Sequence, residues 1–330
     1  MKKLLFLGSI LALLAAYLNT QCANRLVGQV NASTKERSIG DRLDTPLVIV
    51  NVSVTGSDNR QIPDLTEKDF AIAEDRVKQE ITMFVGHGSP VSFSLALDIS
   101  DSEPLKIMAL QAAWSFAKQM RSIDDAVIPQ FKANRAAVWE FAADKLKLEK
   151  ALSGLSSNNR SPLVSVIAEA IKFTKAERKS LRKFTAVITD GLSLSGTAAD
   201  REAADAILRE NTPIYFIILD DGRYRSHTAN QLRIRQTRNL LTRIADVSGG
   251  EAVAVKSADE ISAAVEKIIR RVNSQYTIGY YPTNEKYDGV FRYFSVTVTP
   301  KDKRTVKVFA PLGYYAPVIT NSREEKTDDK

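Results

Sequence analysis

From residue 91 to residue 272, short apolar runs alternate along the chain with longer stretches in which apolar residues recur at helical spacing. This alternation is typical of a mostly parallel β-sheet that is covered by helices on both faces. We therefore expect a doubly wound α/β domain over residues 89–272. The expected strands are 91–97, 136–141, 183–189, 213–219 and 251–255, with a further candidate near 127–131. The expected helices are 105–120, 163–174, 198–210, 234–247 and 258–272.

The first strand of this domain runs into the sequence DISDS, whose alternate residues Asp98, Ser100 and Ser102 supply one carboxylate and two hydroxyl groups. In an open α/β sheet, ligands bind outside the carboxyl ends of the strands. Oxygen ligands suit a hard divalent cation, and Mg²⁺ takes only one or two carboxylates because it keeps several waters. A structural interpretation is equally open, in which Asp98 ends the strand and Ser102, before Pro104, caps a helix.

Two further loops bring oxygen atoms to the same edge of the expected sheet. Asp190 follows the strand 183–189, and Ser161 precedes Pro162 at the start of the helix 163–174. If the strands lie side by side, both side chains face Asp98. Taken singly, an Asp before Gly is typical of a turn, and a Ser before Pro is typical of a helix start. The metal-binding interpretation therefore depends on the three loops together.

The residues on either side of the α/β domain have a β-rich pattern. Alternating runs cover residues 47–55, 70–73 and 81–85 before the domain, and residues 291–299 and 305–311 after it. Since neither flank is large enough to be stable alone, we expect the two to pair into a small β module. The expected limits of the flanks are 45–86 and 273–317. Residues 24–44 are predicted to be a linker, and residues 318–330 a disordered tail.

The N-terminus has the pattern of an export signal. Lys2 and Lys3 precede an apolar run that stops near Leu18, which is short for a membrane span. We expect residues 1–23 to be a signal peptide and the mature chain to be secreted or periplasmic. An uncleaved membrane anchor is the second alternative, and a lipid anchor at Cys22 is the third.

Composition and charge exclude several kinds of site. The 330 residues include only two histidines, His87 and His227, and one cysteine, so zinc sites, iron–sulfur sites and Cys–His nucleophiles are excluded or nearly so. The net charge of +7 favours acidic partners, and we expect no nucleic-acid binding. Residues 223–243 contain six arginines. We interpret them as the solvated basic face of an amphipathic helix, with an anion-binding surface as the alternative.

In their order along the chain, the five candidate ligands resemble the metal-ion-dependent adhesion site of von Willebrand factor type A domains, which is written D-x-S-x-S, then Thr, then Asp. The matching residues are Asp98, Ser100, Ser102, Ser161 and Asp190. The resemblance implies that they bind Mg²⁺, or Mn²⁺, and that a carboxylate of a protein partner completes the coordination shell. It also implies a Rossmann-like fold of the von Willebrand factor A type for residues 89–272.

The flanks are similar to one branch of this family, the VWFA-related acidobacterial domain family of exported bacterial proteins. The similarity is carried by residues 64–70 with 74–75 and 79–81, by residues 275–282, and by residues 313–317. The chain departs from the usual pattern at four positions. Ser161 stands where Thr is usual, Asp101 and Arg76 each replace a common Gly, and Ser165 occupies a position where a supporting Asp is frequent.

The resemblance implies an exported, non-enzymatic binding module that attaches an acidic group of a protein partner through its metal ion. A metal-free scaffold that interacts through its β module is the main alternative. A cation-assisted hydrolase is a third hypothesis. No Ser–His pair, helix-borne carboxylate pair or Gly-rich phosphate loop in the sequence supports it. Contact with a membrane is expected only through an uncleaved N-terminal segment, and the sequence does not indicate an oligomeric state.

Overall fold

The structure is a computed structural model that describes residues 46–99, 102–132, 135–141, 163–176, 180–192, 194, 197–220 and 228–318. The chain divides into a first unit, residues 1–44, and a second unit, residues 45–330. The first unit lies wholly outside the described residues, as do residues 319–330. The expected signal peptide and linker, and all but the first residue of the expected tail, therefore stay predictions.

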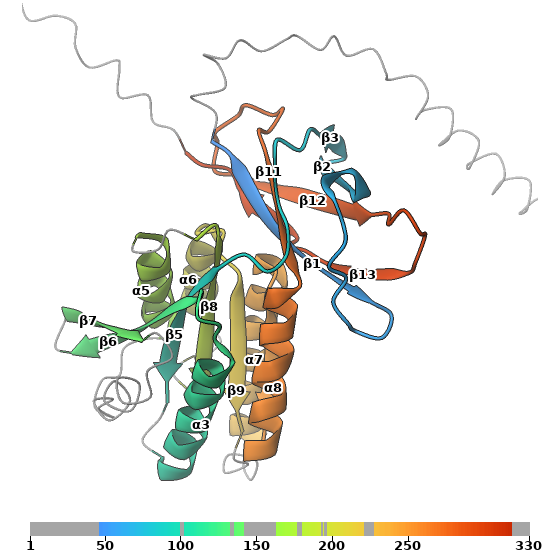
Figure 1. Ribbon diagram of the computed structural model, residues 1–330. Helices are drawn as coiled ribbons and strands as arrows, with labels where there is room; N and C mark the ends of the chain where they lie inside the picture. The colour runs from blue at the N-terminus through green and yellow to red at the C-terminus, as the bar shows by residue number, and fades with distance from the viewer. Residues whose placement is uncertain are drawn as a thin grey trace, which may run out of the picture. The chain divides into compact units, whose positions relative to one another are not determined.

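A six-stranded sheet forms the centre of the α/β domain, in the order β10-β9-β8-β5-β6-β7 (Figure 1). All neighbouring pairs are parallel except the edge pair of β6 and β7, which is antiparallel. The strands are β5 (Val91–Asp98), β6 (Asp125–Lys132), β7 (Arg135–Phe141), β8 (Arg182–Thr189), β9 (Ile214–Leu219) and β10 (Glu251–Val255). The expected doubly wound fold is confirmed, and the weaker candidate near 127–131 is the strand β6.

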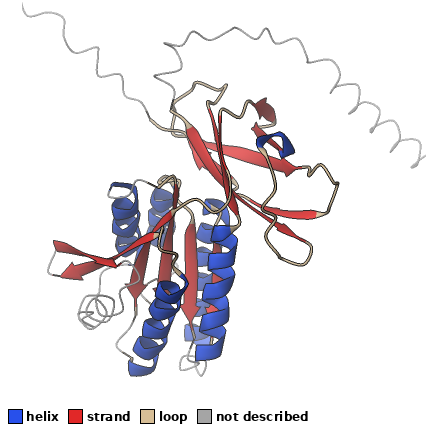
Figure 2. Cartoon of the chain, in the orientation of Figure 1, coloured by secondary structure: helices blue, strands red, loops and turns tan. Residues whose placement is uncertain are grey.

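Helices cover both faces of this sheet (Figure 2). One face packs against α3 (Glu103–Gln119) and α8 (Ala258–Asn273). The other packs against α5 (Leu163–Ala176), α6 (Ala198–Leu208) and α7 (Thr228–Ser248). In β5, Phe93 and Leu95 belong to the first core and Ala96 to the second. Because both faces are buried, the central strands are almost continuously apolar.

The helix α7 begins earlier than the apolar pattern indicated. It starts at Thr228 rather than at residue 234. Its first turns are mostly polar, so no apolar pattern marks them, but they contain no Gly or Pro that would break the helix. Leu241 and Ile244 on this helix are buried, whereas Leu232 is 57% exposed. Within the part of the chain that is described, no helix combines the length and the apolar character that crossing a membrane requires.

The two flanks form two four-stranded sheets, as the pairing prediction required. One has the order β13-β1-β11-β4 and the other β14-β12-β2-β3. The strands of the first are β1 (Val48–Gly56), β4 (Met83–Val85), β11 (Gln275–Tyr280) and β13 (Val306–Phe309). Those of the second are β2 (Phe70–Glu74), β3 (Val77–Gln79), β12 (Phe291–Val298) and β14 (Gly313–Tyr315). Every neighbouring pair is antiparallel, and each sheet mixes strands from both flanks.

Three of the motif stretches in the flanks meet at one buried carboxylate, that of Glu74. The hydroxyl groups of Tyr280 and Tyr314 donate hydrogen bonds to its Oε2, at 2.7 and 3.1 Å. Arg292 Nη1 lies 3.4 Å from Oε1, and both charged residues are 2% exposed. Burial and the neighbouring carboxylate raise the pKa of Tyr280, so its hydroxyl stays protonated and donating. The motif residues therefore hold the β module together.

A short helical turn, η1 (Glu67–Asp69), precedes β2 and begins with a capping box between Thr66 and Asp69. Asp69 Oδ2 accepts hydrogen bonds from the backbone N–H of Thr66 at 2.7 Å and from its hydroxyl at 2.8 Å. These hydrogen bonds hold the pKa of Asp69 below its ordinary value. The carboxylate thus fixes the chain as it enters the second sheet.

Replacing Arg76 by glycine is expected to raise the free energy of unfolding by about 1 kcal/mol. Asp75 and Arg76 join β2 to β3 with φ values of 47° and 71°, and the flanking residues Glu74 and Val77 are paired. Such a two-residue turn needs positive φ at both central positions, which costs energy in a residue with a Cβ atom. Urea unfolding of Arg76→Gly measures the gain. Lys78→Gly in β3, the control, should lower stability by about 0.5–1 kcal/mol, and a loss in Arg76→Gly would refute the explanation.

Candidate functional site

The carboxyl ends of β5 and β8 lie side by side and bring two of the predicted ligands to one edge of the sheet. Asp98 is paired in register with Thr189, and the backbone N–H of Asp190 donates to the carbonyl oxygen of Asp98 at 3.3 Å. From β5 the chain runs to β6 and β7 on one side, and then from β8 to β9 and β10 on the other. The order therefore reverses between β5 and β8, at the switch point where open α/β sheets bind ligands.

The side chain of Asp98 is oriented by a residue that sequence reasoning missed. Thr189 Oγ1 donates to Asp98 Oδ2 at 2.8 Å and accepts from the backbone N–H of Gly191 at 2.8 Å. Thr189 is fully buried, so its hydroxyl has a fixed position between the two loops. The available signal was a hydroxyl side chain at the end of an apolar strand, directly before Asp190.

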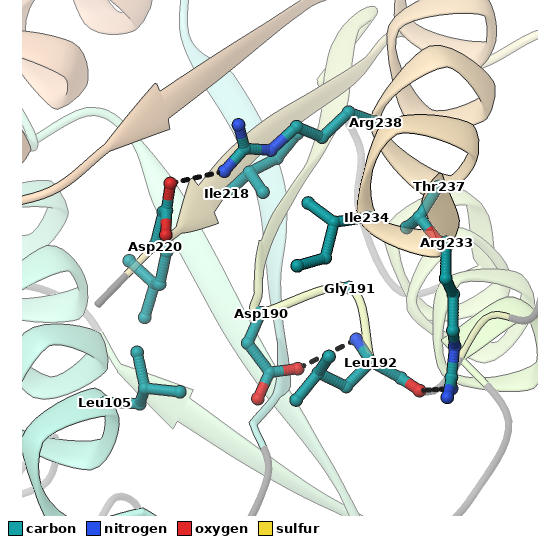
Figure 3. Close-up of a pocket in the computed structure, with 11 residues that line it drawn as sticks. Leu105, Asp190, Gly191, Leu192, Ile218, Asp220, Arg233, Ile234, Thr237 and Arg238 are labelled. Carbon is teal, nitrogen blue, oxygen red and sulfur yellow. Dashed lines mark hydrogen bonds and ion pairs between the residues drawn. The ribbon is translucent and has the colours of Figure 1, made fainter. Parts of the chain in front are cut away.

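The loop after β8 turns sharply at Gly191, where φ is +73°. Asp190 Oδ1 accepts a hydrogen bond from the backbone N–H of Leu192 at 3.0 Å (Figure 3). This contact is the turn that we weighed as the structural interpretation of Asp190. A carboxylate has lone pairs beyond the one that this bond uses, so the turn and metal binding are compatible.

Ser102 caps α3, as its structural interpretation predicted. Its Oγ accepts from the backbone N–H of Leu105 at 3.5 Å, and the residue is 4% exposed. A hydroxyl oxygen that accepts one hydrogen bond keeps a second lone pair and its own hydrogen. Capping therefore leaves Ser102 able to act as a ligand. Ser100, Asp101 and Ser161 lie outside the described residues, whereas Ser165 lies in α5.

The donor chemistry of the described ligands fits a magnesium ion. Asp98 and Asp190 supply carboxylate oxygens, and Ser102 supplies a hydroxyl oxygen. Across the ranges that the structure covers, no group of three or more His, Cys, Asp or Glu side chains is placed to hold a metal ion. A site with two carboxylates and several hydroxyls does not need such a group, because Mg²⁺ takes one or two carboxylates and fills its shell with water and other oxygens.

A small pocket adjoins Asp190 and is bounded on the other side by α7 (Figure 3). Asp220 directly follows the next strand, β9, and Arg238 Nη2 donates to its Oδ2 at 2.7 Å. Arg233 donates to the carbonyl oxygens of Leu192 and Leu194. Arg233 is exposed and Arg238 is partly exposed, as a solvated basic face requires, but each of them also makes a contact at the sheet edge. Both reach back toward the loops at the sheet edge.

Replacing Thr189 by valine is expected to lower the free energy of unfolding by about 1–3 kcal/mol. The change keeps the shape of the side chain but leaves the buried N–H of Gly191 without its acceptor, and it removes the donor to Asp98. Thr189→Ser keeps the hydroxyl and is the matched control, with a smaller loss. Thermal or urea unfolding measures both variants. Equal losses in the two would mean that packing of the methyl group, and not the hydroxyl, fixes this loop.

Comparison with known proteins gives similarity at the level of fold. No protein-family model and no curated protein matches the chain. A solved von Willebrand factor type A structure from Catenulispora acidiphila is 14% identical, covers 79% of this chain and 64% of its own, and has a TM-score of 0.44. The von Willebrand factor domain of a type V pilus tip protein from Porphyromonas gingivalis is 10% identical, with coverages of 56% and 95% and a TM-score of 0.41. An aerotolerance-related membrane protein from Bacteroides fragilis is 18% identical, with coverages of 55% and 98% and a TM-score of 0.40.

The sheet order decides the type of fold. Five parallel strands with an antiparallel edge strand, helices on both faces and a switch point between β5 and β8 match the fold that the sequence resemblance implied. The domain has a von Willebrand factor A-type fold. At identities below 20%, the likeness to solved von Willebrand factor A-type structures concerns the path of the backbone. The chemistry of the site has to be argued from this chain's own residues.

Proposed function

We propose that the chain is a non-enzymatic binding module that attaches an acidic group of a protein partner through Mg²⁺. The ion, for which Mn²⁺ can substitute, would be held by five residues: Asp98, Ser100, Ser102, Ser161 and Asp190. The observation that supports the proposal most strongly is the meeting of Asp98 and Asp190 at the switch point of the sheet, beside the capped start of α3.

The arrangement of the ligands explains why an acidic partner is favoured. Mg²⁺ takes one or two carboxylates and keeps water in its remaining positions, so a carboxylate of the partner can replace one of these waters. Thr189 orients the Asp98 carboxylate, and the turn at Gly191 orients Asp190. The chain's own residues thus position the ion, and the carboxylate of the partner completes its shell.

Several features favour binding over catalysis. Only two histidines are present, and the described one, His87, packs beside the ring of Tyr276 in the β module, with ring centroids 5.9 Å apart. A general base or nucleophile at the site would have to come from its carboxylates or hydroxyls, which the proposal assigns to the ion. We also infer export through residues 1–23, which gives a secreted or periplasmic protein.

A metal-free scaffold is the second candidate, and one surface feature favours it. Tyr293 is 63% exposed on the second sheet, and its ring contacts Phe291, which in turn contacts Tyr315. Exposed aromatic side chains of this kind are enriched at protein interfaces. The β module could therefore bind a partner without any ion.

Calorimetric titration of Mg²⁺ and Mn²⁺ into the protein separates the two candidates. The proposal predicts saturable binding of one ion per chain, followed by tighter binding of acetate to the ion-loaded protein than to the ion-free protein. No heat from either ion would favour the scaffold. Turnover of an ester or phosphate panel that disappears in Asp190→Ala would instead favour a cation-assisted hydrolase.

A further inference from the structure

The pocket next to Asp190 is built from the ends of two strands and the first half of α7 (Figure 3). Its polar lining comes from Asp190, Asp220, Arg233, Thr237 and Arg238. The cavity volume is about 30 Å³. Since a water molecule needs roughly 10–15 Å³ on this measure, the space is close to that of a carboxylate group.

Two hydrogen-bond donors in this pocket have no partner among the described residues. Thr237 is 2% exposed and its Oγ1 accepts and donates no hydrogen bond there. The Nε of Arg238 is also buried and has no acceptor, although its Nη2 is paired with Asp220. Buried donors without a partner are rare in native proteins, and two of them lining one cavity indicate a missing acceptor.

Thr237 lies close against the loop that carries Asp190. A Cβ atom on Gly191 would lie 2.9 Å from the Thr237 methyl group, so the absence of a side chain at Gly191 lets α7 approach this closely. Asp190 therefore belongs both to the proposed metal site and to the wall of the pocket. A group in the pocket and a group on the ion would lie on either side of the same carboxylate.

The charges around the pocket favour an anionic acceptor. Asp220 compensates the charge of Arg238, whereas Arg233 donates only to backbone carbonyl oxygens and has no acidic partner among the described residues. Binding of a divalent cation beside Asp190 would neutralise that carboxylate. The net charge around the pocket would then be positive. The donors Thr237 and Arg238, with Arg233 at the rim, would therefore favour a negatively charged acceptor in the pocket.

We propose that this pocket is a second binding site for the same partner, and that it takes a second carboxylate. The module would then recognise a pair of neighbouring acidic residues: one carboxylate on the ion, and the other hydrogen-bonded to Thr237 and Arg238. This inference depends on the proposed function, because the ion provides the first contact. A bound water molecule is the competing occupant of the pocket.

The test uses the full chain loaded with Mn²⁺ and two capped dipeptides, one of Asp and Glu and one of Asp and Gln. These probes differ only in whether the second side chain carries a carboxylate. We expect wild type to bind the diacidic peptide about tenfold more tightly. In Thr237→Val, which keeps the side-chain shape, the ratio of the two peptide affinities should fall close to one while the affinity for Mn²⁺ stays unchanged. Thr242→Val, on the exposed side of α7, is the matched control and should keep the preference.

Each outcome assigns the failure to one claim. If Mn²⁺ binds but wild type does not prefer the diacidic peptide, or if Thr237→Val keeps the preference, the pocket holds water and only the second binding site is refuted. If Mn²⁺ does not bind, the proposed function fails and this inference fails with it. Unfolding without metal provides an independent readout. Thr237→Val removes a donor without a partner, so it should be at least as stable as wild type, and a clear loss of stability would mean that the hydroxyl has a structural role.

Discussion

Replacing Glu74 with alanine is expected to lower the free energy of unfolding by about 3–5 kcal/mol, the typical result of removing one partner of a buried ion pair. The guanidinium group of Arg292 is 2% exposed and would lose its buried counter-charge. The hydroxyl groups of Tyr280 and Tyr314 would lose their shared acceptor at the same time. The substitution therefore leaves two buried tyrosine hydroxyls without their shared acceptor. It also removes the buried carboxylate that faces Arg292, although Arg292 keeps its contacts with the carbonyl oxygens of Asn284 and Lys286 and with Asp288.

Urea unfolding at neutral pH, followed by circular dichroism, measures this loss. Glu74→Gln keeps an acceptor for the tyrosines and should be less destabilising than Glu74→Ala. Glu80→Ala removes an exposed carboxylate from the same module and is expected to change stability by no more than about 0.5 kcal/mol. If Glu74→Ala lost less than about 1 kcal/mol, the buried cluster would not be what holds the two flanks together.

Removing either carboxylate at the switch point is expected to weaken Mn²⁺ binding by about 100-fold or more. Asp98 and Asp190 supply the negative charge of the proposed site, so neither Asp98→Ala nor Asp190→Ala leaves a shell that can compete with water for the ion. Calorimetric titration of Mn²⁺ into each variant, with circular dichroism as a check of folding, measures the effect. A loss of Mn²⁺ affinity this large distinguishes a carboxylate that binds the ion directly from a nearby charge that attracts it only by long-range electrostatics.

Glu103→Gln is the matched control for this series. Glu103 directly follows Ser102 in the first turn of α3, and its exposed carboxylate pairs with Lys106 at 3.0 Å. Its loss changes the local charge as much as the loss of Asp98 but removes no proposed ligand. A fall in Mn²⁺ affinity of similar size in Glu103→Gln would show that the ion responds to general acidity, and would contradict the assigned ligand set.

The fold of the α/β domain could be predicted from the sequence because its signals are local. Each strand is a short apolar run, and three of the described helices begin at a side-chain cap, namely Ser102, Thr197 or Ser257. In the β module, β3, β11 and β14 were not predicted as strands. Three residues, the length of β3 and β14, are too few to establish an alternating pattern. Arg76 stands where Gly is common in the family that the sequence resembles, and its φ of 71° gives a physical reason for that glycine.

The details of the site could not be predicted, because they depend on contacts between distant parts of the chain. The hydrogen bond from Thr189 to Asp98 requires the register of β5 against β8, which the sequence does not specify. The pocket beside Asp190 requires α7 to pack closely over Gly191. The sequence identified Glu74 and Tyr280 as motif residues, but only the four assembled strands β2, β11, β12 and β14 show that they share one buried cluster.

Anomalous diffraction from crystals grown with MnCl₂ tests the central claim most directly, because it locates the ion without reference to a partner. We predict one peak at the carboxyl ends of β5 and β8, within about 2.5 Å of Asp98 and Ser102 oxygen atoms, with Asp190 bound directly or through a water. A well-ordered site with no peak, or a peak elsewhere on the domain, would contradict the claim that these loops hold a cation.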